Sequence, residues 1–321
     1  MNTALMADIP VEITRADEIA QGIHLFEMRR TDGSELPPFT AGSHINLHLN
    51  NGLVRKYSLC SDPADRSHYR VAIKREEQGR GGSKYLIDHT KVGDHWTISA
   101  PDNAFALPQR GDNFIFIAGG IGITPFIAMI HALKDDPAKK FKLYYLSRTP
   151  EMTAFRDELS APELKDRVII HYDNGDPSKG LDLRPIVAER KNREHVYCCG
   201  PRGLMEAVRA ATEHWTPTSI HFEAFGEADA RRADDKPFEV KLASSGKVLT
   251  VPAGTTILEA MRADGLDVPS SCETGTCGTC RTKLLEGEAD HRDLVLTEKE
   301  QASQIMICVS RAKTPQITID R

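Results

Sequence analysis

Three cysteines stand within nine residues near the end of the chain, and no other stretch restricts its fold as strongly. They are Cys272, Cys277 and Cys280, spaced C-x4-C-x2-C, and Cys308 follows them. This is the plant-type arrangement of the four thiolates that hold a [2Fe-2S] cluster. Glycine and threonine fill the loop, which leaves backbone N–H groups free to point at sulfur. The segment is therefore expected to wrap around an inorganic core.

Disulfides and a structural zinc ion are the alternatives for these thiols. Disulfides are disfavoured because the cysteines number seven, and because Met1 to Asp8 lacks the basic and apolar regions of an export signal. Zinc sites of four cysteines usually arrive as two separated C-x2-C pairs, whereas a lone cysteine follows a triple here. We therefore expect one-electron iron–sulfur chemistry in a reducing, cytoplasmic compartment.

Length and composition indicate a globular protein of two or three domains. The chain has 321 residues, of which 40% are hydrophobic and 27% charged, and no apolar run is long enough to cross a bilayer. The net charge is −5 and no basic stripe offers a footprint for a phosphate backbone. We expect a monomer that binds neither nucleic acid nor membrane and depends on local sites.

Short strands and turns alternate up to about residue 108, which predicts a small antiparallel barrel or sandwich over 1–108. Within it, Arg55-Lys56-Tyr57-Ser58 places a cation, an aromatic ring and a hydroxyl on one strand. Such a set can neutralise, stack on and hydrogen-bond a flat anionic ligand. Gly81-Gly82-Ser83 then leads into a short helix, whose first N–H groups suit a phosphate. Taken alone, each of these two motifs is more often an ordinary strand or turn without a ligand. Their order along the chain favours a ligand site.

Alternating strands and helices over 109–226 predict an open parallel sheet with helices on both faces. Phe114–Ala118 is an apolar strand, and Gly119-Gly-Ile-Gly-Ile-Thr124-Pro125 turns from it into a helix over 126–134, with Thr124 as N-cap and Pro125 first in the helix. Further strands are expected at 142–147, 167–172, 195–199 and 219–225, and helices near 153–159, 183–190 and 203–215.

Ligands of such sheets bind at the carboxyl ends of the strands, where the glycine turn and Cys199-Gly200-Pro201 both lie. The glycines depart from the G-x-G-x-x-G form, which makes them a weaker indicator of a dinucleotide. Cys198 and Cys199 end an apolar strand, where free cysteine is most often a small core residue, although either could approach a ligand at the strand end.

The charged run 227–236 has no strand pattern and is interpreted as an interdomain linker. After it, strands at 238–242 and 247–251 form a predicted hairpin, and a helix over 256–263 precedes the cysteine loop. Residues 237–321 are therefore a small α+β module that carries the cluster. The other charged residues are interpreted as solvated surface, and His291 as an exposed loop histidine.

Five motifs stand in the order used by the ferredoxin–NADP reductase superfamily, which this chain resembles. They are Arg55-Lys56-Tyr57-Ser58, Gly81-Gly82-Ser83, Gly119–Pro125, Cys199-Gly200-Pro201 and Glu223-Ala-Phe225-Gly226. With a plant-type ferredoxin appended, the domain order is similar over essentially the whole chain to the phthalate dioxygenase reductases and the related vanillate demethylase reductases. The resemblance implies an antiparallel β-barrel flavin domain, an α/β NADH domain and an α+β ferredoxin domain that pass electrons to a Rieske-type oxygenase.

The resemblance also implies roles for single residues, without any catalytic acid or base. FMN would be held by Arg55, Lys56, Tyr57, Ser58, Ala72, Ile73, Lys74, Gly81, Gly82 and Ser83, with Thr124 near its reactive edge and Phe225 on its ring face. NADH would be lined by Gly120, Gly122, Cys199, Gly200 and Pro201, and the irons would be held by Cys272, Cys277, Cys280 and Cys308.

Three choices stay open at this point. FMN follows from the phthalate branch and FAD from the wider superfamily, and the lack of an obvious aromatic platform after Ser83 favours FMN. Asp173 could accept the ribose hydroxyls of NADH, although Asp173-Asn-Gly is more often a turn, and Arg148 would tolerate the extra phosphate of NADPH. The acceptor could also be a monooxygenase of the vanillate demethylase type, or the chain a flavin and iron–sulfur carrier or sensor.

Overall fold

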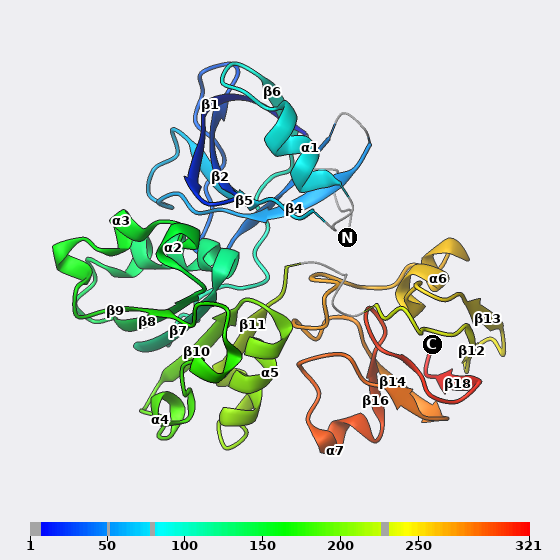
Figure 1. Ribbon diagram of the computed structural model, residues 1–321. Coiled ribbons are helices and arrows are strands. Elements are labelled where there is room, and N and C mark those ends of the chain that lie inside the picture. The colour runs from blue at the N-terminus through cyan, green and yellow to red at the C-terminus, as the bar shows by residue number, and fades with distance from the viewer. Residues whose placement is uncertain (1–7, 50–51, 78–80, 226–230) are drawn as a thin grey trace. The chain divides into compact units, whose positions relative to one another are not determined.

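Six antiparallel strands form the N-terminal sheet of the computed structural model, which describes residues 8–49, 52–77, 81–225 and 231–321. Their order is β4-β3-β6-β1-β2-β5, and the end strands β4 and β5 lie next to each other, so the sheet curls into a barrel (Figure 1). Period-two alternation buries one face of β1 over its first half. The strands are β1 Ile9–Ala20, β2 Ile23–Arg30, β3 His44–His48, β4 Val54–Ser58, β5 Tyr69–Lys74 and β6 His95–Ile98, and the helix α1 spans Gly82–His89 between β5 and β6.

A five-stranded sheet follows, in the order β11-β10-β7-β8-β9. The pairs β10–β7, β7–β8 and β8–β9 are parallel, as the alternation of strands and helices predicted. Its strands are β7 Asn113–Gly119, β8 Lys140–Ser147, β9 Val168–Tyr172, β10 Glu194–Cys199 and β11 Ile220–Glu223. Helices α2 and α3 cover one face, and α4 and α5 cover the other (Figure 1).

The helices of this sheet differ in part from the prediction. They are α2 Thr124–Leu133, α3 Arg156–Leu159, α4 Arg184–Val187 and α5 Arg202–Ala211, with short 3-10 turns at η1 Gly120–Ile123, η2 Pro150–Met152, η3 Pro162–Leu164, η4 Pro177–Lys179 and η5 Pro217–Ser219. The prediction of Thr124 as N-cap is wrong, because η1 runs directly into α2 and the residue before the helix is Ile123, itself in a helical conformation. Thr124 is the first residue of α2, and its hydroxyl donates to the Ile121 carbonyl at 3.1 Å.

One apolar core joins the barrel to the parallel sheet. The ring of Phe105, after the last barrel strand, lies 5.1 Å from Tyr197 and 6.0 Å from Phe126, measured between ring centroids. An ion pair of 3.3 Å links Arg70 of the barrel to Glu158 of α3. These contacts place the flavin motifs and the nucleotide motifs in one compact unit, Met1–His221.

The second compact unit, Phe222–Arg321, carries the cysteines. Its main sheet has the order β13-β12-β18-β14-β16, and β15 pairs with β17. The predicted hairpin is confirmed, since β12 and β13 pair antiparallel. The elements are β12 Phe238–Leu242, β13 Val248–Val251, α6 Ile257–Ala263, β14 Arg281–Glu286, β15 Ala289–Asp290, α7 Glu298–Gln301, β16 Gln304–Met306, β17 Arg311–Ala312 and β18 Gln316–Ile319.

A capping box starts helix α6: Thr256 accepts from the Glu259 amide at 3.1 Å, and the Glu259 carboxylate accepts from the Thr256 amide at 2.8 Å. Of the predicted linker, 227–230 lies outside the described residues, and 231–236 has neither helix nor strand. Within the described part of the chain, no helix has the length and apolarity that a bilayer span requires.

Candidate flavin, nucleotide and iron–sulfur sites

The two predicted flavin motifs meet at the start of helix α1. A Cβ added at Gly82, the first residue of α1, would lie 2.7 Å from Nε of Arg55 on β4, so the arginine side chain crosses directly over the helix N-terminus. Gly81 precedes it with φ 79°, and the first turn holds no acidic residue. A guanidinium and unsatisfied first-turn N–H groups together suit a phosphate.

Neighbouring residues of β4 point to alternate faces of the sheet. Arg55 and Tyr57 share the half-buried face, whereas Lys56 is exposed on the other. Burial raises the pKa of Tyr57 to about 12, against the opposing charge of Arg55, so its hydroxyl keeps its proton at neutral pH. Ser58 is buried at the strand end. The roles of these residues toward a flavin stay predictions, and Lys56 and Ser58 lie on the opposite face of β4 from Arg55 and Tyr57.

The remaining flavin candidates lie on β5 and just after it. Ala72 and Ile73 are buried in the sheet. The ammonium of Lys74 is 2.7 Å from the carboxylate of Glu76, and the hydroxyl of Ser83 accepts the Glu76 amide at 3.1 Å. Glu76 therefore ties the end of β5 to the turn that starts α1.

The two nucleotide motifs are pressed together at the carboxyl ends of β7 and β10. A Cβ added at Gly122 would lie 2.2 Å from the Cys199 carbonyl oxygen, and one added at Gly119 would lie 2.7 Å from Cδ of Pro201. One at Gly200 would lie 2.9 Å from Cα of Gly119. Helix α5 begins at the residue after Pro201. These positions require glycine because the two backbone segments approach so closely. With glycine at these positions, no side chain there keeps a dinucleotide away from the ends of β7 and β10 or from the start of α5.

Other predicted nucleotide residues have clear structural surroundings. Thr124 and Cys199 are buried, and Gly120 has φ 53° with open space beside it. Burial raises the pKa of the Cys198 thiol, which confirms it as a small core residue. The carboxylate of Asp173 accepts the Gly175 amide at 2.7 Å, which confirms the turn interpretation of that residue.

Phe225 follows β11 in the second compact unit and is 39% exposed. Its expected place on the flavin ring stays a prediction. The Gly226 that ends the same motif lies outside the described residues.

The four cluster cysteines form two pairs of thiols. The thiols of Cys272 and Cys277 shift each other's pKa, and so do those of Cys280 and Cys308, so each pair lies close together. No three histidine, cysteine or acidic side chains converge on one ion position among the described residues. A binuclear cluster does not require that, because each of its two irons takes only two protein ligands. Two pairs of thiols therefore fit a [2Fe-2S] cluster better than a single zinc ion.

Backbone donors surround the first pair. The amides of Thr274 and Thr276 each donate to Sγ of Cys272 at 3.5 Å. The hydrogen bond with Cys277 lowers the pKa of Cys272, and these threonine donors lower it further against the effect of burial. Gly275, between the threonines, has φ 75°, which only glycine adopts without strain. The loop thus stabilises a thiolate at Cys272, the form that binds iron.

Family models match the three parts of the chain. A model described as an oxidoreductase FAD-binding domain covers residues 10–106, an oxidoreductase NAD-binding domain covers 116–210, and a 2Fe-2S iron–sulfur cluster binding domain covers 240–313. The reductase subunit of phthalate 4,5-dioxygenase from Pseudomonas putida is 48% identical over 97% of this chain and 96% of its own. This chain belongs to the phthalate dioxygenase reductase family.

A solved member of the phthalate dioxygenase reductase family, described as a modular structure for electron transfer from pyridine nucleotides to [2Fe-2S], has the same fold. Its TM-score is 0.74 at 45% identity, with 98% of each chain covered. The vanillate O-demethylase oxidoreductase of a Pseudomonas strain is 39% identical over 97% of this chain and 99% of its own. The predicted family, the antiparallel flavin part, the parallel NAD-binding part and the ferredoxin part are confirmed.

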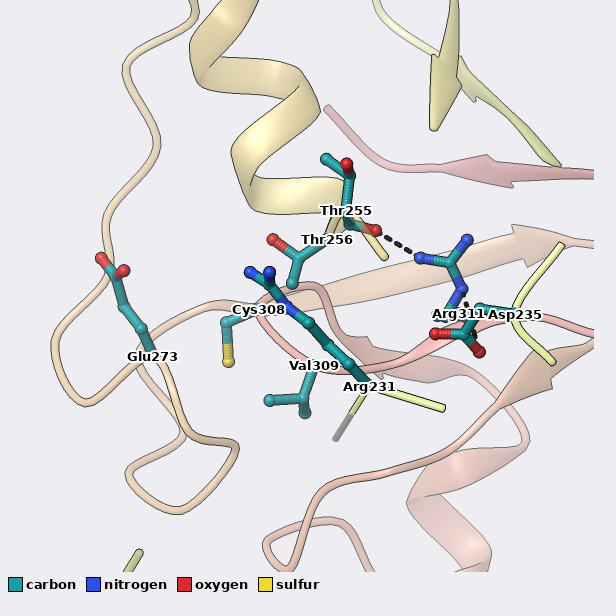
Figure 2. Close-up of a pocket in the computed structure, with 8 residues that line it drawn as sticks. All are labelled: Arg231, Asp235, Thr255, Thr256, Glu273, Cys308, Val309 and Arg311. Atoms are coloured by element: carbon teal, nitrogen blue, oxygen red, sulfur yellow. Dashed lines mark hydrogen bonds and ion pairs between the residues drawn. The ribbon is translucent and has the colours of Figure 1, made fainter. Parts of the chain in front are cut away.

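Buried charges behind the cluster loop are the feature of this family member that the sequence did not indicate. The side chains of Asp235, Arg292 and Arg311 are buried in the second unit, although all three were interpreted as linker or solvated surface. Asp235 and Arg311 line a small cavity together with Cys308 (Figure 2). His291 was expected to be exposed and is instead half-buried, with Nε2 3.1 Å from the Gln301 carbonyl.

Proposed function

We propose that this chain is the NADH-dependent reductase component of a Rieske-type oxygenase system, most directly one of the phthalate dioxygenase kind. The full-length alignment with a phthalate 4,5-dioxygenase reductase subunit carries the proposal. Bound flavin supplies the conversion that this needs, because it accepts a hydride from NADH and releases electrons singly to a [2Fe-2S] cluster. The chain itself supplies binding, orientation and charge.

Each predicted set of residues has a task in this function. Arg55 and the first turn of α1 neutralise and hold the phosphate of the flavin. The close approach of Gly119 and Gly122 to the end of β10 leaves room for the nucleotide beside the start of α5. The loop amides of Thr274 and Thr276 stabilise thiolate charge in the cluster site. No side chain has to move a proton in the electron transfer.

An anaerobic absorbance titration with NADH tests the relay. Flavin and iron–sulfur bands should bleach together, with three electrons taken up per chain, because the flavin holds two and the cluster one. Bleaching of the flavin alone would favour the carrier or sensor function over the reductase.

FMN is the flavin that we propose, although the matching family model is described as FAD-binding. A phosphate site at the start of α1 completes FMN, whereas FAD needs a further surface for its adenine. Heat release of the bound flavin followed by chromatography distinguishes them, and an FAD peak would reject the choice.

NADH is the proposed donor in preference to NADPH. Because the Asp173 carboxylate is engaged in its own turn, the preference rests on the family rather than on that residue. Comparable kcat/KM values with NADPH would contradict it.

The electron acceptor is proposed from the relatives. Turnover with a purified phthalate dioxygenase oxygenase should exceed turnover with a vanillate demethylase oxygenase at equal concentrations. The reverse order would assign this chain to the monooxygenase type, which the vanillate relative represents.

We also propose that the protein works as a monomer in the cytoplasm, where thiols that bind iron stay reduced. Light scattering of the holoprotein should give a mass near 35.6 kDa. Twice that mass would contradict the monomer.

A further inference from the structure

A buried ion network fixes segment 231–236 within the second unit. The Asp235 carboxylate is 4% exposed and accepts two hydrogen bonds from Arg292, at 3.1 Å and 2.6 Å. Nε of Arg311 lies 3.7 Å from the same carboxylate. Removing one partner of such a pair is strongly destabilising, because an uncompensated charge stays buried. Asp235 is therefore the residue on which this attachment depends.

Two more side chains of the same segment have partners in this unit. Nη2 of Arg231 donates to Glu259, in the capping box of α6, at 2.7 Å. Nη1 of Arg232 lies 3.5 Å from Asp290 on β15, and the Arg232 amide donates to Asp235 at 3.2 Å. The segment 231–236 is thus fastened along its length rather than free.

The network reaches the iron–sulfur site. The Arg292 amide donates to the hydroxyl of Ser310 at 3.2 Å, and Ser310 stands two residues after the ligand Cys308. Figure 2 shows Arg231 and Asp235 around the same cavity as Cys308. The end of the predicted linker is therefore part of the scaffold that holds the fourth cysteine.

We propose that Asp235 is a positioning residue for electron transfer, because fastening 231–236 to the [2Fe-2S] unit shortens the chain that tethers this unit to the flavin-binding unit. Once a tether is longer than the span between two sites, the effective concentration of the tethered partner falls by about threefold for each doubling of tether length. The step concerned moves one electron from reduced flavin to oxidised cluster, and no bond forms or breaks. This inference rests on the proposed relay from NADH through flavin to the cluster.

The test compares Asp235→Asn with Asp234→Asn in the full-length holoprotein. Asp234 is the exposed neighbour, so its variant makes the same charge change without breaking the network. After anaerobic mixing with NADH in a stopped-flow instrument, flavin reduction should proceed at the wild-type rate in both variants. Transfer from flavin to cluster should slow by at least about threefold in Asp235→Asn alone. A wild-type rate of this second phase in Asp235→Asn would overturn the proposal.

Two further readouts separate positioning from damage to the cluster. Iron content and the EPR spectrum of the dithionite-reduced cluster should match the wild type. Trypsin, which cuts after arginine, should cleave after Arg231 and Arg232 faster in Asp235→Asn than in Asp234→Asn, independently of turnover. Equal cleavage would mean that the segment stays fastened and would also overturn the proposal.

If Asp235→Asn fails to retain its cluster, Arg231→Gln takes its place. The Arg231 side chain is 34% exposed, so its loss is better tolerated. Because Arg231 lines the Cys308 cavity, the cluster potential is measured in the same samples by EPR titration. Slower transfer than in the wild type at equal driving force supports the proposal, and an equal rate rejects it. Failure of the relay itself would appear in the wild-type protein, as a flavin that bleaches without the cluster.

Discussion

The nucleotide site of the first unit and the cluster loop of the second both depend on glycine, for different physical reasons. At Gly122 the cause is proximity, since an added Cβ would lie 2.2 Å from the backbone oxygen of Cys199. At Gly278 the cause is conformation, since φ is 84° and the nearest atom to an added Cβ is 3.5 Å away. Proximity between distant segments exists only in the complete fold, whereas a left-handed turn is local. The first site is therefore expected to tolerate substitution less well than the second.

Gly122→Ala should give the largest effect. The added methyl group meets backbone atoms, which cannot move aside, so we expect a loss of about 3 kcal/mol or more in the free energy of unfolding. NADH-driven flavin reduction should fall with it. Denaturant unfolding and stopped-flow reduction measure the two effects.

Gly203→Ala is the matched control for that change. Gly203 lies in α5, and an added Cβ there has no atom within 4 Å. It should stabilise the chain by about 0.5–1 kcal/mol, as alanine does in helices. A Gly122→Ala protein as stable as this control would refute the role of close approach.

Gly275→Ala and Gly278→Ala separate the effects of conformation and of proximity within the cluster loop. Both impose a left-handed conformation on alanine, which costs about 1–2 kcal/mol. Only Gly275 is also close to neighbours, because its added Cβ would lie 2.6 Å from Cγ2 of Val309. Iron bound per chain should therefore fall clearly in Gly275→Ala and little in Gly278→Ala. Equal losses would mean that conformation alone controls the loop.

The same contrast explains what the sequence could predict. Local signals were sufficient for the cysteine loop and for the hairpin of β12 and β13. The start of α2 was misplaced because the turn η1 continues into the helix, so that Thr124 bonds back to Ile121 instead of capping. Helices α3 and α4 are single turns, shorter than their predicted ranges.

Local sequence patterns could not predict which charged side chains are buried. Arg292 stands in a charged run, which predicts a surface residue. Its partner Asp235 stands 57 positions earlier in the chain. Nothing near either residue indicates the pair. Only the fold brings the two charges together, so that neither is left buried without a partner.

A comparison of Arg55→Gln with Lys56→Gln tests which cation of the first unit binds the flavin phosphate. The two cations are neighbours in sequence and lie on opposite faces of β4, with Arg55 over the start of α1. Loss of a charged hydrogen bond of about 1.5–3 kcal/mol should weaken flavin binding by roughly 10- to 150-fold in Arg55→Gln. Lys56→Gln should bind almost as the wild type does. Fluorescence titration of apoprotein with FMN measures both, and equal weakening would place the phosphate elsewhere.

Acid should affect the two units at different pH values. Burial, with repulsion from Lys56, lowers the pKa of His44 in the barrel from its ordinary 6.5 to about 4, against the attraction of Asp102. In the second unit, desolvation raises the pKa of Asp235, but hydrogen bonds from Arg292 outweigh it and the net shift is downward. Its stabilising contribution is therefore lost only below the ordinary carboxylate pKa of 3.8.

His44→Gln should accordingly make the first unit less sensitive to mild acid. Between pH 6.5 and about 4 the unfolded chain binds a proton at His44 that the folded barrel does not, so stability falls as the pH falls. The loss is about 1–3 kcal/mol for a buried histidine. Calorimetry from pH 7 to 4.5 should show a shallower decline of the first unit's transition in His44→Gln than in the wild type. His48→Gln, at an exposed position on the same strand, should retain the wild-type slope. If all three proteins decline in parallel, burial of His44 is not what makes the first unit sensitive to acid.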